Sequence, residues 1–277
     1  MILENNKLVQ KAGCSALATL EEEAGMQILP FLDPIVNTLI MALQKYQQKN
    51  LLILYDAFGT LADTVRGALS VPKYVDMFMP LLMAKWQQVP DDSRNIFPIF
   101  EVYFNLIKCL SCIAIAIKDL FAPFALPVWN RCLRLITECL MAAKAHENNP
   151  QLEFPDKEFL IVSLDLISGI IQSLGVKSSA LIEDNPSFYN ILAMCAQDPT
   201  SDVKTSAFAC IGDLAMMNFP SLASQLPALM PIIVITYLPR LRVLTPIILL
   251  RGLLQLTMPH GVLVKLPFGM VTLWTRG

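Results

Sequence analysis

The feature of this chain that most constrains its fold is a proline that recurs inside apolar segments at an almost constant spacing. Pro34, Pro80 and Pro127 are 46 and 47 residues apart, and Pro231 follows Pro127 after 104 residues, about twice that step. The missing copy falls in the apolar segment at residues 188–194. A period of roughly 40 to 50 residues, with two helices in each period, is typical of HEAT and armadillo arrays.

Between these prolines, apolar residues recur every three or four positions, which indicates amphipathic helices. Examples are Val9, Ala12, Ala16 and Leu20; Leu54, Ala57, Leu61 and Val65; and Val203, Ala207, Ile211 and Leu214. We therefore predict an all-α solenoid of antiparallel helix pairs, with about five repeats in residues 1–232, ten to twelve helices and no strand. Stacking of neighbouring repeats explains why 55% of the chain is hydrophobic and only 16% is charged. An ordinary helical bundle is the alternative fold.

The high hydrophobicity does not by itself predict membrane insertion. The most apolar runs, at residues 109–117, 229–238 and 243–250, are shorter than the roughly 18 to 20 residues that span a bilayer. The first six residues are polar and acidic, unlike a signal peptide. Seven irregularly spaced cysteines suit a reducing cytosolic or nuclear setting. The lone pair Cys109 and Cys112 lacks the partners that zinc needs, so we expect core thiols and no bound metal.

Enzymatic function is disfavoured by the absence of recognisable motifs. The chain has no GxGxxG, Walker A, GxSxG or HExxH sequence, and it holds only two histidines. We expect neither a cofactor nor catalysis. Residues 1–232 contain 16 basic and 23 acidic side chains, a net charge of 16 − 23 = −7. This charge repels nucleic acid and favours basic partners.

Acidic residues recur on the second helices of the predicted repeats. Asp56 and Asp63 are seven positions apart, about two helical turns, so they share a helix face. Asp165 and Asp213 each stand between apolar neighbours, and residues 21–23 are three consecutive glutamates. Because the second helices of a solenoid line one concave surface, these acids could form a site for an extended basic segment. The alternative is an ordinary solvated face or, for Asp165, a buried acid satisfied by a neighbouring backbone.

At these residues the chain resembles the transportin type of importin-β nuclear import receptor. The similarity covers residues 5 to about 232 in order. Its motifs are KYQQKNLLILYDA at residues 45–57, GTLAD at residues 59–63, SLDL at residues 163–166 and GDL at residues 212–214. Further matching stretches lie at residues 9–24, 79–86, 97–101, 155–159 and 206–208.

The resemblance implies a cargo-binding role for six acids, which in that family contact basic, extended nuclear localisation signals of the proline-tyrosine type. Those residues are Glu22, Asp56, Asp63, Glu101, Asp165 and Asp213. It also implies action in both cytoplasm and nucleus, with Ran GTPase and nucleoporins as partners of the full-length family and no membrane insertion. The alternatives are a different HEAT scaffold or adaptor and, on hydropathy alone, a membrane-associated helical protein.

The chain also departs from that family. The repeats that bind Ran, the acidic loop that couples Ran to cargo release and an upstream tryptophan helix have no counterpart in it. Residues 102–108 are a seven-residue insertion next to Glu101. Two extra turns would almost preserve the helical face, but we expect them to lengthen the helix past its neighbours.

Residues 233–277 look unlike the rest of the chain. They contain five basic and no acidic residues, and four prolines interrupt any helical period at positions 239, 246, 259 and 267. A shifted reading frame across residues 256–261 restores the family segment Asn-Asn-Ala-Thr-Trp. We therefore predict that this tail is a frame-shifted reading, with a divergent C-terminal helix pair as the alternative.

Overall fold

The computed structural model describes residues 1–88, 100–152 and 155–241. The chain divides into two units, of which the first is Met1–Leu226 and the second begins at Pro227. In the described residues all regular structure is helical, with eleven α-helices, four 3-10 helices and no strand. The predicted all-α class is therefore confirmed. Most of the unusual tail, residues 242–277, lies outside the described residues.

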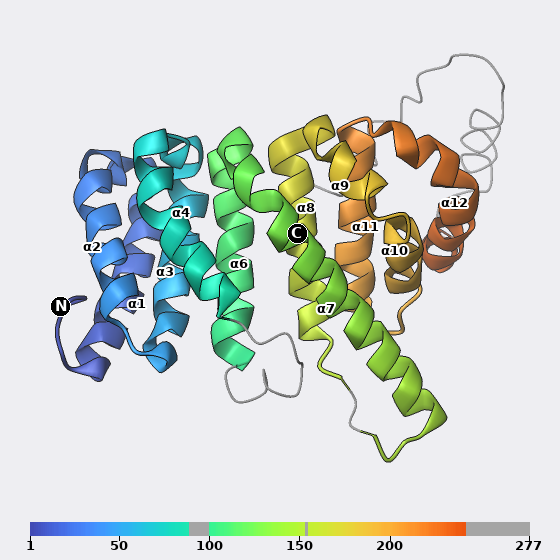
Figure 1. Ribbon diagram of the computed structural model, residues 1–277, viewed down its shortest axis with the longest axis horizontal. Coiled ribbons are helices and arrows are strands. Elements are labelled where there is room, and N and C mark those ends of the chain that lie inside the picture. Colours follow the sequence, from blue (N-terminus) through green and yellow to red (C-terminus); the bar gives the residue numbers. More distant parts are fainter. Residues whose placement is uncertain (89–99, 153–154, 242–277) are drawn as a thin grey trace. The chain divides into compact units, whose positions relative to one another are not determined.

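Two layers of helices build the first unit (Figure 1). The stacked layer consists of α1 (Lys7–Ala24), α3 (Gln48–Val65), α6 (Phe100–Ile117), α8 (Glu158–Leu174) and α11 (Ser201–Met216). Each of these helices packs against the next one in the series. The cover layer consists of α2 (Leu32–Lys45), α4 (Pro72–Gln87), α7 (Ala122–Asn148) and α10 (Phe188–Ala196). A short helix, α9 (Ser179–Glu183), precedes α10, and α12 (Pro220–Leu241) begins in the first unit and continues into the second.

The recurring prolines lie in the cover layer. Pro34, Pro80 and Pro127 belong to α2, α4 and α7, and all three are exposed. The expected fourth copy, at residues 188–194, falls in α10. Proline has no N–H to donate, and on an exposed helix face water can solvate the carbonyl that loses its partner. The repeat period in the sequence therefore marks one helix of each pair.

Glycine allows the stacked helices to approach closely. A Cβ atom on Gly169 of α8 would lie 3.0 Å from Oγ of Ser111 and 3.3 Å from its carbonyl oxygen on α6. A Cβ atom on Gly59 of α3 would lie 3.6 Å from Cα of Cys109. The backbones of α3, α6 and α8 are therefore in near contact at the middle of the stack.

Aromatic pairs join the two layers. The rings of Phe58 on α3 and Phe78 on α4 meet edge to face with centroids 5.4 Å apart, and both residues are fully buried. Within the cover layer, Trp129 of α7 lies against Phe188 of α10 at 5.1 Å. Such pairs add about 0.5 to 1.5 kcal/mol each beyond the area they bury. The first pair fixes α4 on the stack, and the second fixes α10 beside α7.

Each stacked helix is followed by a residue with φ near +50°, after which the chain turns back toward the cover layer. After the first four helices the turn is a 3-10 helix: η1 (Gly25–Phe31), η2 (Arg66–Leu69), η4 (Lys118–Phe121) and η5 (Gly175–Ser178). The residues with positive φ are Gly25, Arg66, Lys118, Gly175 and Asn218. Because side chains disfavour positive φ, glycine relieves strain at two of these five turns.

Replacing Gly25 with alanine tests this turn geometry. A Cβ atom at Gly25 meets nothing within 4 Å, so the cost is backbone strain alone. We expect Gly25→Ala to lower the free energy of unfolding by about 1 to 2 kcal/mol, measured by urea denaturation. Gly67→Ala is the matched control, since its Cβ atom also meets nothing and its φ is not positive. Equal effects of the two changes would contradict the strain argument.

Two ion pairs that link consecutive repeats differ strongly in how far their side chains are buried. Nζ of Lys157, just before α8, lies 2.7 and 2.8 Å from the two carboxylate oxygens of Asp198, just before α11, and the side chains are only 11% and 7% exposed. Asp198 also accepts a hydrogen bond from the backbone N–H of Thr200. By contrast, the pair between Lys177 and Asp119 is 68% and 63% exposed. Only the first pair is shielded from water.

This difference in burial predicts different mutational costs. Asp198→Ala leaves a largely buried ammonium without its carboxylate, so we expect a loss of about 3 kcal/mol or more in the free energy of unfolding. Asp119→Ala removes an exposed pair and should cost no more than about 1 kcal/mol. Thermal or urea unfolding of both variants checks this. A small effect of Asp198→Ala would show that the pair contributes little to the contact between repeats.

Candidate functional site

The three middle helices of the stacked layer, α3, α6 and α8, expose very few side chains. On α6 the exposed residues that the structure describes recur every seven positions, as Glu101, Lys108 and Ile115, and on α8 they are Glu158, Asp165 and Gln172. On α3, Asp56 and Asp63 follow the same spacing. Seven residues rise about 10.5 Å along a helix, so each helix presents one side chain per two turns. We call Asp56, Asp63, Glu101, Lys108, Glu158 and Asp165 the acidic face.

Direct contacts place the middle of α6 between two of these acids. The thiol of Cys112 donates a hydrogen bond to Oδ2 of Asp63 on α3 at 3.3 Å. Burial, together with the nearby charge of Asp63, raises the pKa of this thiol to about 12, which keeps its proton in place. On the other side, the hydroxyl of Ser111 donates to the backbone oxygen of Asp165 on α8 at 3.1 Å. Asp63 and Asp165 therefore flank α6 at the same level.

Asp165 is exposed but partly desolvated. Burial of its carboxyl raises its pKa, whereas a hydrogen bond from Ser206 of α11 and the positive charge of Lys108 act in the opposite direction. The alternative of a fully buried acid therefore does not hold for Asp165. Its carboxyl lies in reach of solvent, with the neighbouring helices α6 and α11 on either side.

Asp213, expected on the exposed face, is buried instead. It is 5% exposed, and its carboxylate accepts hydrogen bonds from the Ser168 hydroxyl and, at 3.0 Å, from the side-chain amide of Gln172. Burial raises the pKa of Asp213, and the two donors on α8 offset part of that rise. This carboxylate joins α8 to α11 through its Oδ2 atom, which accepts both hydrogen bonds.

The three glutamates of α1 have different surroundings. Glu22, the expected site residue, and Glu23 are exposed, whereas Glu21 is fully buried. Neither carboxyl oxygen of Glu21 has a hydrogen-bond partner. Burial, and to a lesser degree the charge of Glu22, raises the pKa of Glu21 to about 8. The sequence did not distinguish the buried glutamate from its exposed neighbours, because all three are adjacent.

The expected lengthening of the helix by residues 102–108 is wrong. Helix α6 has 18 residues, the same as α1 and α3, so the predicted insertion lies in the first turns of a helix of ordinary length. It therefore places Glu101 near the start of α6 and Lys108 one turn before Ser111 and Cys112. Between Asp63 and Asp165 the structure thus has a lysine, a residue that the sequence analysis did not assign to the site.

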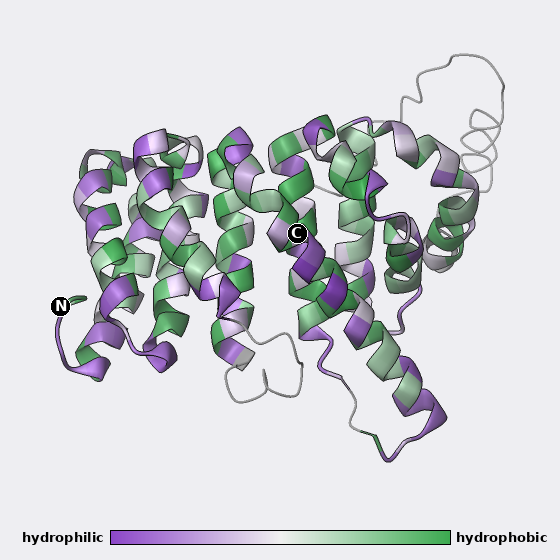
Figure 2. Ribbon diagram, viewed as in Figure 1, coloured by the Kyte–Doolittle hydropathy of each residue, from purple (hydrophilic) through white to green (hydrophobic). Residues whose placement is uncertain are grey.

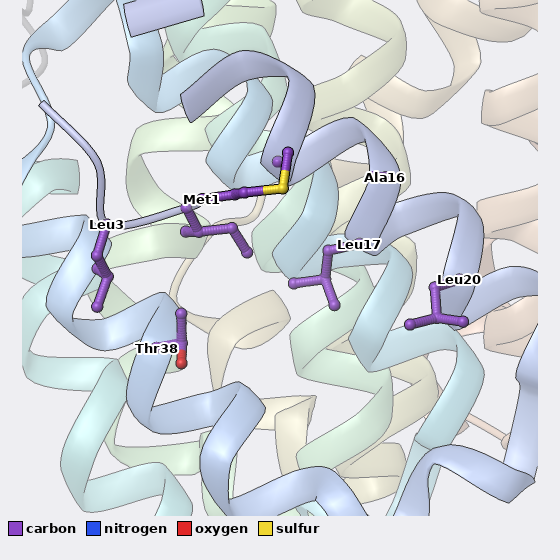
Figure 3. Close-up of a pocket in the computed structure, with 8 residues that line it drawn as sticks. Met1, Leu3, Ala16, Leu17, Leu20 and Thr38 are labelled. Atoms are coloured by element: carbon purple, nitrogen blue, oxygen red, sulfur yellow. The ribbon is translucent and has the colours of Figure 1, made fainter. Parts of the chain in front are cut away.

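A shallow apolar hollow lies elsewhere, near the start of the chain (Figure 3). It has a volume of about 400 Å³, and the N-terminal residues Met1 and Leu3, Leu17 and Leu20 of α1 and Thr38 of α2 are among its lining. No titratable side chain lines it, and across the described ranges no group of three or more metal-ligating side chains occurs. Of the seven free cysteines, five are buried and Cys112 and Cys139 are partly exposed, so they largely pack in the core as predicted.

Three helical segments are long and apolar enough to cross a membrane by length and composition alone, whereas the most apolar runs of the sequence were each too short. They are Lys7–Lys45, Glu101–Asn148 and Glu158–Glu183. Figure 2 shows α6 and α8 as mostly hydrophobic. In α8, all but five of 17 residues are buried against neighbouring helices. Packing of a stacked helix on several sides accounts for this composition.

The comparisons with known proteins define the class. The family model of importin subunit beta-1-like TPR repeats matches residues 2–229. TPR repeats, like HEAT repeats, are antiparallel helix pairs that stack into a solenoid. The chain therefore belongs to the importin-β family of helical-repeat proteins.

Within that family the chain is similar to transportins. It is 44% identical over 231 residues to importin subunit beta-2 of Schizosaccharomyces pombe, 42% over 233 residues to transportin-1 of Homo sapiens and 43% over 214 residues to transportin-1 of Oryza sativa. These alignments cover 83%, 84% and 77% of this chain and 25%, 25% and 23% of the relatives. The chain thus spans about a quarter of their length. The family match ends before the tail, and the frame shift there stays a prediction.

The buried glutamate of α1 predicts an unusual pH dependence of stability. The pKa of Glu21 is about 8 in the folded chain and near 4.5 when unfolded. Since the folded state keeps this proton longer, the free energy of unfolding should fall as pH rises from about 4.5 to 8, by several kcal/mol at most. Urea unfolding at several pH values measures this slope.

Glu21→Gln should remove that slope and stabilise the chain at pH 8. Glu23→Gln, at an exposed position of the same helix, is the matched control and should keep the slope of the unmodified chain. If Glu21→Gln leaves the pH dependence unchanged, another group is responsible for it.

Proposed function

We propose that this chain is a cargo-recognition part of a nuclear import receptor, and that its acidic face binds extended, basic nuclear localisation signals. One observation carries the proposal: in a chain of the importin-β family, Asp56 and Asp63 are exposed on α3 and Asp165 is exposed on α8, the two stacked helices on either side of α6. Glu101 and Glu158 add negative charge near the starts of α6 and α8. Glu22, exposed on α1, would extend the same surface to the first stacked helix.

The geometry suits an extended ligand better than a compact one. Packed helices lie about 8 to 10 Å apart, and an extended chain rises about 3.3 Å per residue. A peptide that crosses the stack would therefore meet a new helix about every three residues. Each exposed charge pair contributes roughly 0.2 to 1 kcal/mol, so several contacts are needed to offset the ordering of a disordered segment.

Asp213 has a different part in this proposal. Because its carboxylate is buried and bonded to Ser168 and Gln172, it holds α8 and α11 in register and does not bind the ligand. The proposed site thus comprises the exposed acids Glu22, Asp56, Asp63, Glu101 and Asp165, together with Glu158 of the acidic face. Ran GTPase and nucleoporins are proposed partners of the longer receptor, acting between cytoplasm and nucleus.

Charge reversal on α3 tests the proposed site. The double change Asp56→Lys and Asp63→Lys should weaken binding of a basic proline-tyrosine signal peptide about tenfold or more at low ionic strength. The effect should shrink as salt is added, because exposed charges are screened. Fluorescence anisotropy with a labelled peptide measures both quantities.

The matched control is the double change Asp76→Lys and Glu183→Lys. It alters the net charge equally, at exposed positions on α4 and α9. We expect it to weaken binding far less. Equal losses in both double variants, or an unchanged affinity after reversal on α3 at low salt, would refute the assignment of the acidic face.

A further inference from the structure

A lysine stands in the middle of the acidic face. Lys108 is exposed on α6, one turn before the residues that contact Asp63 and Asp165. Its charge acts on the residues of both flanks. It opposes the rise in the pKa of Cys112, whose thiol is hydrogen-bonded to Asp63, and it also opposes the rise in the pKa of Asp165. A positive charge therefore separates the acids of α3 from the acid of α8.

Lys108 is held in place without being neutralised. Its Nζ lies 5.0 Å from the ring centroid of Phe104, one turn earlier on α6, which is within the range of a cation–π contact. In the described part of the chain it forms no salt bridge. The ammonium thus stays available to an anion that approaches the face from solvent.

This arrangement constrains the ligand. A lysine or arginine that crosses α6 at this level would meet a like charge, whereas an anionic side chain would meet an opposite one. The spacing of about three residues per helix places a ligand's contacts with α3, α6 and α8 at positions i, i+3 and i+6.

We infer that Lys108 is a specificity-determining residue, which selects extended segments that carry an anionic side chain between two basic residues. This inference rests on the proposed function, since it assumes that the acidic face binds a basic segment. The anion is a carboxylate or a phosphate group, and both would pair with the ammonium. A phosphoserine carries about −1.5 to −2 charges at neutral pH, so phosphorylation of the central residue would strengthen the contact.

The test uses four peptides that are identical except at the central position. Each has arginine three residues before and three residues after a central arginine, serine, glutamate or phosphoserine. Dissociation constants are measured at low salt for the whole 277-residue chain and for its Lys108→Glu variant. Lys144→Glu, exposed on α7 of the cover layer, is the control with the same change in net charge. Circular dichroism confirms that the variants are folded.

The expected result is a change of preference that depends on position 108. The unmodified chain should bind the glutamate peptide at least as tightly as the arginine peptide, despite the two fewer positive charges. Lys108→Glu should shift the ratio of these two dissociation constants about fivefold or more toward arginine, and Lys144→Glu less than twofold. Tighter binding of phosphoserine than of glutamate identifies phosphate as the preferred anion, and equal or weaker binding identifies carboxylate.

Two outcomes would overturn the inference in different ways. If both lysine variants shift the ratio equally, Lys108 acts only through net charge, and the inference fails while the proposed function stands. If none of the peptides binds the unmodified chain or the Lys108→Glu variant at low salt, the proposed function fails, and the inference fails with it.

Discussion

The close stacking of helices is the constraint on which the rest of this structure depends. Gly59 and Gly169 let the backbones of α3, α6 and α8 come into near contact, so these helices are covered on both flanks as well as by the cover layer. What remains free is a narrow edge that shows one residue in seven. The chemistry of the surface is therefore set by a handful of positions, while almost every other residue of these helices belongs to the core.

The small number of exposed positions explains why the same composition suits both a membrane protein and a repeat protein. A helix with one exposed residue per two turns is nearly as apolar as a membrane span, and hydropathy alone cannot separate the two. The distinguishing feature is the regular spacing of the polar residues along the helix. Glu158, Asp165 and Gln172 occupy successive exposed positions of α8, where a lipid-facing helix would carry apolar side chains.

The sequence predicted the architecture well because the repeat period and the helical period are local patterns. The prolines marked the cover helices, and the seven-residue spacing of Asp56 and Asp63 was sufficient to place them on one exposed edge. The sequence did not predict the burial of an acidic side chain where that burial depends on neighbouring helices. Asp165 and Asp213 both stand between uncharged, non-polar neighbours, yet only Asp213 is covered and bonded by Ser168 and Gln172. Likewise, nothing local marks Glu21 as buried, because a step of one residue, about 100° around the helix, decides it.

The predicted insertion of residues 102–108 in α6 has a consequence for how such a surface can change. Seven residues complete almost two whole turns, so the buried faces stay in phase with α3 and α8, whereas an insertion of five would rotate the helix by about 140°. An insertion of seven residues thus shifts the charged residues of one helix by one exposed position relative to those of its neighbours and leaves the packing of the buried faces intact. In α6, Lys108 is exposed where the neighbouring helices carry aspartates, as the predicted insertion would explain. Repeat proteins of this kind can acquire a new recognition pattern through one length change, without rebuilding their interior.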